Sequence, residues 1–188
     1  MKAVQFHGHG GQDVIQYDEV PEQPPGPNEV RIDVKAAALN HLDVWTRRGM
    51  PGLDLEMPHT PGSDAAGVVV AVGENVERFQ QNDRVAVSAG VSCGRCEFCR
   101  DGEPSMCVRY EVIGEHRPGV HAEYATVPAD NLVPVPEGVA WEVAGSASLV
   151  FQTAWRMLVT RADLSPTDSV LVLGASGGVG HAAVQIAD

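Results

Sequence analysis

The chain has 188 residues, and 44% of them are hydrophobic, which is enough to bury a core and argues against global disorder. Its formal net charge is −12 with only two lysines, so it lacks the clustered positive charge that nucleic-acid binding requires. No apolar run approaches the length of a membrane span and no signal peptide is visible, so we expect a cytoplasmic protein without a membrane partner.

Short strands punctuated by glycine and proline dominate residues 1–137. Strands are expected at residues 1–6, 14–20, 29–36, 64–72, 84–88, 121–127 and 131–135, with a helical segment at 39–48. Residues 29–36 alternate apolar and charged side chains, which is typical of a half-buried strand. Gly67 indicates a bulge or a close backbone approach. The pattern predicts a mainly β domain in the form of a partly open barrel.

All four cysteines of the chain fall in one lobe, residues 88–110. Cys93, Cys96 and Cys99 form a Cys-x-x-Cys-x-x-Cys run, and Cys107 follows after seven residues. Four thiolates at this spacing can enclose a tetrahedral Zn²⁺ and leave no open position for a substrate, which favours one structural zinc. The alternatives are another metal, such as an iron–sulfur cluster, whose usual last gap is shorter, or free or paired thiols.

The character of the sequence changes in residues 138–188. Residues 141–147 and 149–162 have helical periodicity, and the apolar run 169–173 predicts a strand buried on both faces. The glycine-rich turn 174–180 follows, and a helix is expected from residue 181. A strand, a glycine turn and a helix open a dinucleotide-binding unit, although a simple tight connection is the alternative. Because one such unit cannot bury its own strand, we expect the chain to be the N-terminal part of a longer protein.

The four-cysteine lobe followed by the glycine turn resembles the zinc-containing medium-chain dehydrogenase/reductase superfamily over essentially the whole chain. The resemblance implies a GroES-like catalytic domain, the start of a Rossmann domain, and NAD or NADP as cofactor. It implies cofactor contacts at His41, Thr153, Ser176, Gly177, Gly178, Val179 and Gly180. Thr153 would lie beside the nicotinamide and His41 near the pyrophosphate, with an ordinary surface histidine as the alternative for His41.

Alcohol dehydrogenases of this superfamily hold a catalytic zinc at positions that are occupied here by Asn40, Ser63 and Leu149. The segment from Asn40 to Gly49 instead resembles quinone oxidoreductases. This resemblance implies that the structural zinc is kept and the catalytic zinc is lost. Without a Lewis acid, we expect hydride transfer to quinones or to activated C=C or carbonyl compounds.

The resemblance implies a substrate site formed by Asn40, Asp43, Trp45, Ser63 and Asp64. Asn40 would donate a hydrogen bond to the developing oxyanion, or alternatively cap the following helix. Asp43 is expected to pair with Arg47 or Arg48. Trp45 would line the substrate cleft or else belong to the core, and the pair at 63 and 64 would order water.

Two other functions stay open. A true alcohol dehydrogenase could rebuild a catalytic zinc site from His41, Asp43, Asp64 or His59. Alternatively, the chain by itself could be a zinc-stabilised scaffold without enzymatic activity. For the complete protein we expect a small-molecule substrate and a homo-oligomer, with no nucleic-acid partner.

Overall fold

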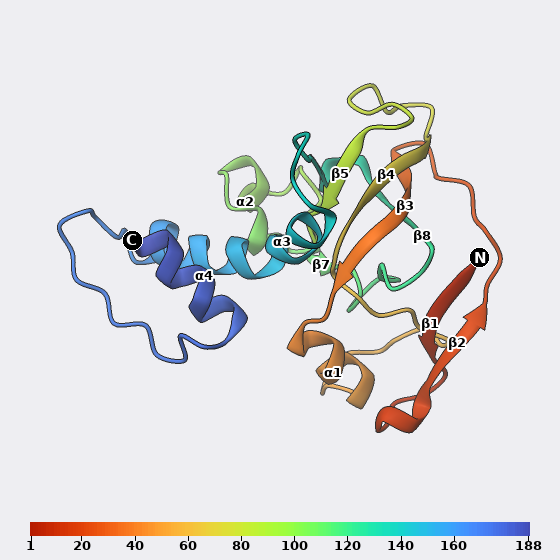
Figure 1. The fold of residues 1–188 in the computed structure, drawn as a ribbon, viewed down its shortest axis with the longest axis horizontal. Coiled ribbons are helices and arrows are strands. Elements are labelled where there is room, and N and C mark those ends of the chain that lie inside the picture. Colours follow the sequence, from red (N-terminus) through yellow and green to blue (C-terminus); the bar gives the residue numbers. More distant parts are fainter. The chain divides into compact units, whose positions relative to one another are not determined.

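The computed structural model describes residues 1–188, which divide into two compact units, Met1–Ser146 and Ala147–Asp188 (Figure 1). The first unit is mainly β and the second is mainly helical. None of the helices combines the length and the apolar character that crossing a membrane demands.

An open five-stranded antiparallel sheet forms the centre of the first unit, in the order β8-β3-β4-β5-β9 (Figure 1). Its strands are β3 (Glu29–Ala38), β4 (Asp64–Val72), β5 (Arg84–Val87), β8 (Tyr124–Pro128) and β9 (Leu132–Pro134). The outer strands β8 and β9 do not pair with each other, so the sheet stays open as expected.

Two small antiparallel pairs flank this sheet. Strand β1 (Lys2–Phe6) pairs with β2 (Ile15–Glu19), and β6 (Gly90–Val91) pairs with β7 (Glu111–Val112). Single bridges between Ala3 and Ala122 and between Phe6 and His59 tie β1 to the rest of the unit. The mainly β domain predicted from the sequence is confirmed.

The hydrophobic core follows from the alternation in β3. Val30 and Ile32 are fully buried, together with Val69 of β4 and Val85 of β5. Each such side chain contributes about 1.5–3 kcal/mol by leaving water. At Gly67 the β3 and β4 backbones come so close that an added Cβ would lie 2.1 Å from the Asp33 carbonyl oxygen. The predicted close approach is therefore confirmed, and it coincides with a shift in strand register.

The longest helical segment departs from the sequence prediction. Residues 141–162, expected as two helices, form the single helix α3 (Trp141–Trp155) continued by the π-helical η4 (Arg156–Arg161). The other helical segments are α1 (His41–Arg48), α2 (Glu97–Arg100), α4 (Gly178–Ala187) and the 3₁₀ turns η1 (Gln12–Val14), η2 (Pro104–Met106) and η3 (Ala129–Asn131).

Residues 169–173 do not form the predicted strand. A strand is defined by its hydrogen-bonded neighbours, and this segment has none among the residues of the chain. Leu171 and Leu173 are accordingly 84% and 85% exposed. The core of the second unit lies elsewhere, where Ala154 and Leu158 pack against Ala182 and Ala183 of α4.

Candidate functional site

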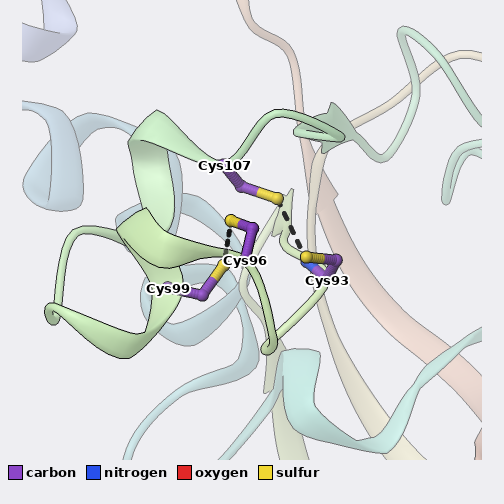
Figure 2. A group of neighbouring side chains, drawn as sticks. All are labelled: Cys93, Cys96, Cys99 and Cys107. Atoms are coloured by element: carbon purple, nitrogen blue, oxygen red, sulfur yellow. Dashed lines mark hydrogen bonds between the residues drawn. The ribbon is translucent and has the colours of Figure 1, made fainter.

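The four cysteine side chains converge on one point of the lobe. Figure 2 shows their sulfur atoms turned toward one another, and all four Sγ atoms lie within 4.8 Å of each other. Cys93 follows β6, Cys96 is the N-cap of α2, Cys99 lies within α2, and Cys107 follows η2. Segments without a hydrophobic core of their own thus present four thiols to a common centre.

The geometry of this cluster fits zinc. A tetrahedral Zn²⁺ with Zn–S bonds of about 2.3 Å places its sulfur ligands about 3.8 Å apart. The Sγ atoms of Cys96 and Cys99 are 3.4 Å apart, so a small outward movement would accommodate the ion. Cys107 is buried and the other three cysteines are half-buried.

Backbone amides prepare the cluster for a cation. The N–H groups of Cys93 and Arg109 each donate to Cys107 Sγ at 3.3 Å. Amide donors, first those of Arg95 and Cys96, lower the pKa of the Cys93 thiol to about 5. Burial raises the pKa of Cys99 to about 11, with the neighbouring Cys96 adding to the effect. Since metal ligands must be thiolates, a cation at the centre would draw the remaining protons off.

A second constellation lies where helix α1 meets strand β4. The Nδ2 atom of Asn40 donates to Oδ2 of Asp64 at 2.9 Å, although the two residues are 24 positions apart in the sequence. Asp64 is 1% exposed, so its carboxylate holds the amide in a fixed orientation. The register of the sheet explains the contact, because Ala38 at the end of β3 pairs with Asp64 at the start of β4.

Asn40 is also the N-cap residue of α1. Its backbone N–H donates to Oδ2 of Asp43 at 2.7 Å, and its carbonyl oxygen accepts the Asp43 N–H. The ion pair expected between Asp43 and Arg47 or Arg48 is not formed. Arg47 instead donates to the Gly10 carbonyl oxygen, because it lies on the buried face of the helix.

Ser63 lies beside Asp64 and is fully buried. Its hydroxyl donates to the Ile113 carbonyl oxygen at 2.7 Å, so the side chain holds a neighbouring segment. A part for Ser63 in ordering water at the substrate site stays a prediction.

The predicted site residues on the outer face of α1 contact each other. His41 and Trp45 form an edge-to-face pair with ring centroids 4.7 Å apart, and Trp45 is 51% exposed. Trp45 is therefore not part of the core of the first unit, and its place in a substrate cleft stays a prediction. His41 is exposed at the start of the helix, and its contact with a pyrophosphate stays a prediction.

The side chains that could form a second metal site are hydrogen-bonded to different partners. His59 is buried, and its Nε2 lies 3.1 Å from the Gly114 carbonyl oxygen. Burial lowers the pKa of His59 below its usual value of 6.5. The cysteines are the only group of three or more histidine, cysteine or acidic side chains whose ligand atoms gather.

The second unit carries the predicted cofactor turn. Residues 174–177 form a turn, and α4 begins at Gly178, three residues earlier than predicted. An added Cβ at Gly180 would lie 2.2 Å from the Gly174 carbonyl oxygen, so only glycine lets the turn pack against the first turn of the helix. The sequence positions Ser176, Gly177, Gly178 and Val179 surround this helix N-terminus. Thr153 donates its hydroxyl to the Leu149 carbonyl oxygen at 2.7 Å, and its contact with a nicotinamide stays a prediction.

One residue that supports the site was not found by sequence reasoning. His9 lies near the end of α1, with its Nδ1 3.1 Å from the Thr46 carbonyl oxygen and 3.3 Å from that of Arg47. The Thr46 carbonyl oxygen also accepts the Gly49 N–H and the Arg47 carbonyl oxygen the Gly10 N–H, so the His9 ring adds a side-chain contact to a helix end that the backbone already holds. Nothing in the spacing of a lone histidine in a glycine-rich segment could have indicated this contact.

Comparison with known proteins identifies the family of the chain. Residues 26–137 match the alcohol dehydrogenase GroES-like domain. An alcohol dehydrogenase from Schizosaccharomyces pombe is 36% identical over 98% of this chain and 53% of its own length. A crotonyl-CoA carboxylase/reductase from Cereibacter sphaeroides is 35% identical over 98% of the chain and 45% of its own length.

Solved structures agree with these relatives. The crystal structure of an NAD-dependent alcohol dehydrogenase superposes with a TM-score of 0.94 at 48% identity, covering 100% of this chain and 55% of its own. The chain thus spans about half the length of the relatives it matches. It belongs to the alcohol dehydrogenase GroES-like domain family of the zinc-type medium-chain dehydrogenase/reductase superfamily.

Proposed function

We propose that the protein containing this chain is an NAD(P)-dependent oxidoreductase that reduces quinones or other activated C=C and carbonyl compounds. In this proposal it carries one structural zinc and no catalytic zinc. The observation that carries the proposal is the hydrogen bond from Asn40 Nδ2 to the buried carboxylate of Asp64. An amide and a carboxylate at this place suit hydrogen-bond catalysis better than metal coordination.

The amide group of Asn40 has two N–H donors, and the contact with Asp64 uses one of them. Because a carboxylate only accepts, it turns the Nδ2 end of the side chain toward itself and fixes the amide plane. The second N–H is then free to donate to the substrate oxygen as negative charge develops on it. Such a preorganised donor stabilises the transition state more than the ground state.

Conjugated substrates suit a site that stabilises the developing negative charge with a single hydrogen bond. In a quinone or an enone, hydride addition at carbon spreads the developing charge to a distant oxygen, so one hydrogen bond suffices. The relative from Cereibacter sphaeroides is named for a crotonyl-CoA substrate, whose acyl group is a conjugated C=C–C=O system. This name supports the activated C=C class for the present chain.

A bound NADH or NADPH would supply the hydride. The amides at the start of α4, reached through the turn 174–177, would bind its pyrophosphate, since a helix N-terminus attracts anions. Thr153, in the same unit as this turn, would contact the nicotinamide, as the family resemblance implies. The four cysteines would hold a structural zinc, and their 4.8 Å spread supports this role.

A zinc-dependent alcohol dehydrogenase is the second candidate. It is favoured by the names of the relatives at 36% and 48% identity. It requires a rebuilt metal site. Two of the side chains that could form this site have different partners, however, because Asp64 is hydrogen-bonded to Asn40 and His59 to the Gly114 carbonyl oxygen. These commitments favour the first candidate.

Metal analysis of the full-length protein separates the two candidates. One zinc per chain, with quinone reduction that survives a chelator unable to strip the cysteine site, supports the proposal. Two zinc ions per chain, with turnover that is abolished by the chelator and restored by added Zn²⁺, would establish the alcohol dehydrogenase instead.

A further inference from the structure

His121 lies just before β8, and its ring contacts two segments that lead into the candidate site. Its Nε2 atom is 3.3 Å from the carbonyl oxygen of Ala38, the last residue of β3. The same ring packs against Gly62, where an added Cβ would lie 2.4 Å from His121 Cδ2. Since a carbonyl oxygen only accepts, the Nε2 atom carries the proton and donates to Ala38.

The two contacted residues stand in the same relation to the Asn40–Asp64 pair. Ala38 precedes Asn40 by two residues, and Gly62 precedes Asp64 by two. The ladder between β3 and β4 ends where Ala38 pairs with Asp64, so strand pairing between the two segments stops there. A side chain that bonds one segment and packs on the other holds them together just past the end of the ladder.

The pairing of β3 with β8 explains why a side chain is needed at this point. It reaches no further along β3 than Val34, whose N–H donates to the Glu123 carbonyl oxygen at 3.0 Å. Residues 35–38 of β3 have no partner in β8. The His121 ring reaches this unpaired part of the strand and supplies a donor that the β8 backbone does not.

The backbone of His121 is itself fixed. Its N–H donates to the Pro61 carbonyl oxygen at 3.1 Å, and its carbonyl oxygen accepts the N–H of Val4 in β1 at 2.8 Å. The residue is therefore bonded on one side to the segment that precedes Gly62 and on the other to β1. A ring on such a backbone contacts Ala38 without first having to be ordered.

We propose that His121 is a positioning residue, which clamps the end of β3 to the start of β4 and so keeps the Asn40 amide on the Asp64 carboxylate. This inference rests on the proposed function and adds to it a residue that acts through Asn40. The clamp has two parts, the donor to Ala38 and the packing on Gly62, and substitutions can separate them.

The first test is steady-state reduction of 1,4-naphthoquinone by the full-length enzyme with saturating cofactor. His121→Phe keeps a ring against Gly62 but removes the donor, so kcat should fall about 3- to 10-fold while KM changes less than about twofold. His121→Gln offers an amide donor to the Ala38 carbonyl oxygen and should restore kcat to within about twofold of the wild-type value. His7→Gln is the matched control, because His7 is exposed and its ring is bonded to Asp18 instead.

Chemical rescue distinguishes the donor from the ring. His121 lines a hollow of about 460 Å³ together with Ala37 and Leu39, and this hollow gives small molecules access to the place of the ring. In His121→Ala, imidazole should raise kcat at mildly alkaline pH. The neutral form of 1-methylimidazole has no N–H to donate and should not. Equal rescue by the two compounds would contradict the donor role.

The second test does not depend on turnover. In full-length protein that is isotopically labelled at its asparagines, the NMR signal of the Asn40 side-chain amide is identified by its loss in Asn40→Ala. His121→Phe should shift this signal toward that of a free amide, and His121→Gln should preserve it. This result supports the clamp even if the enzyme reduces no quinone and the proposed function fails. An unchanged Asn40 signal in His121→Phe, or a loss of kcat that His121→Gln does not restore, would overturn the clamp while leaving the proposed reductase intact.

Discussion

Replacing Asn40 with alanine removes the proposed oxyanion donor and, with it, the side chain of the α1 N-cap. The substitution deletes the amide that donates to Asp64 at 2.9 Å but keeps the backbone N–H that donates to Asp43 at 2.7 Å. Helix α1 therefore keeps one half of its capping box, the bond from the backbone N–H of residue 40 to Asp43. A hydrogen bond to a charged group contributes about 1.5–3 kcal/mol, which corresponds to roughly a tenfold to hundredfold loss in rate.

The loss should appear in kcat rather than in KM. The amide acts on charge that exists only in the transition state, so substrate binding is nearly unaffected. Steady-state reduction of naphthoquinone by the full-length enzyme, with saturating cofactor, measures both parameters. We expect kcat to fall about tenfold to a hundredfold while KM changes less than threefold.

Asp43→Ala is the matched control for helix stability. It removes the acceptor of the Asn40 N–H and leaves the Asn40 side chain in place. We expect the free energy of unfolding to fall by about 0.5–1 kcal/mol. The loss is small because the substitution also removes Asp43 Oδ1, which is buried without a hydrogen-bond partner. If Asp43→Ala lowered kcat as far as Asn40→Ala, the effect would come from a displaced helix, and the oxyanion role would be refuted.

Three further substitutions test other parts of the structure. Cys96→Ser should reduce the zinc content of the pure protein below half an ion per chain and raise amide exchange in the lobe, while β3–β4 amides stay protected. His59→Gln should flatten the pH dependence of stability in urea titrations. Burial lowers the pKa of His59 below 6.5, so the unfolded chain binds more protons and stability falls as pH drops below 6.5, by at most about 1.4 kcal/mol per pH unit. Gly180→Ala should abolish NADH binding by the full-length protein, measured by fluorescence, because its Cβ would lie 2.2 Å from the Gly174 carbonyl oxygen; unchanged affinity would refute the role of the turn.

Local pattern was enough to predict most of the first unit. The alternation of residues 29–36 placed Val30 and Ile32 in the core, and the predicted strand 64–72 matches β4 at both ends. Gly67 was identified as a close approach because a glycine within an apolar strand has few other uses. The cysteine spacing likewise indicated a cluster that the fold brings together. In each case the signal lies within about fifteen neighbouring residues.

Contacts between distant segments could not be predicted in the same way. The partner of the Asn40 side chain is 24 residues away, and the partner of Ser63 is 50 residues away. Both depend on strand register, which residue patterns do not specify across long loops. The strand predicted for the apolar run 169–173 was wrong for a related reason. A strand needs a hydrogen-bonded neighbour, and this segment pairs with no other strand of the structure.

Under the proposed function, the contacts of the four-cysteine lobe give it a part in positioning a site that holds no zinc of its own. The segment leaving the lobe is bonded to the segment that leads into β4. Ser63 donates to the Ile113 carbonyl oxygen, His59 contacts the Gly114 carbonyl oxygen, and the Val120 N–H donates to the Gly62 carbonyl oxygen at 3.0 Å. These buried contacts fix the residues on the N-terminal side of Asp64, whose carboxylate orients Asn40. An ordered lobe therefore supports the position of the amide, and under the proposed function this coupling gives a physical reason for the four cysteines to be present without a catalytic zinc.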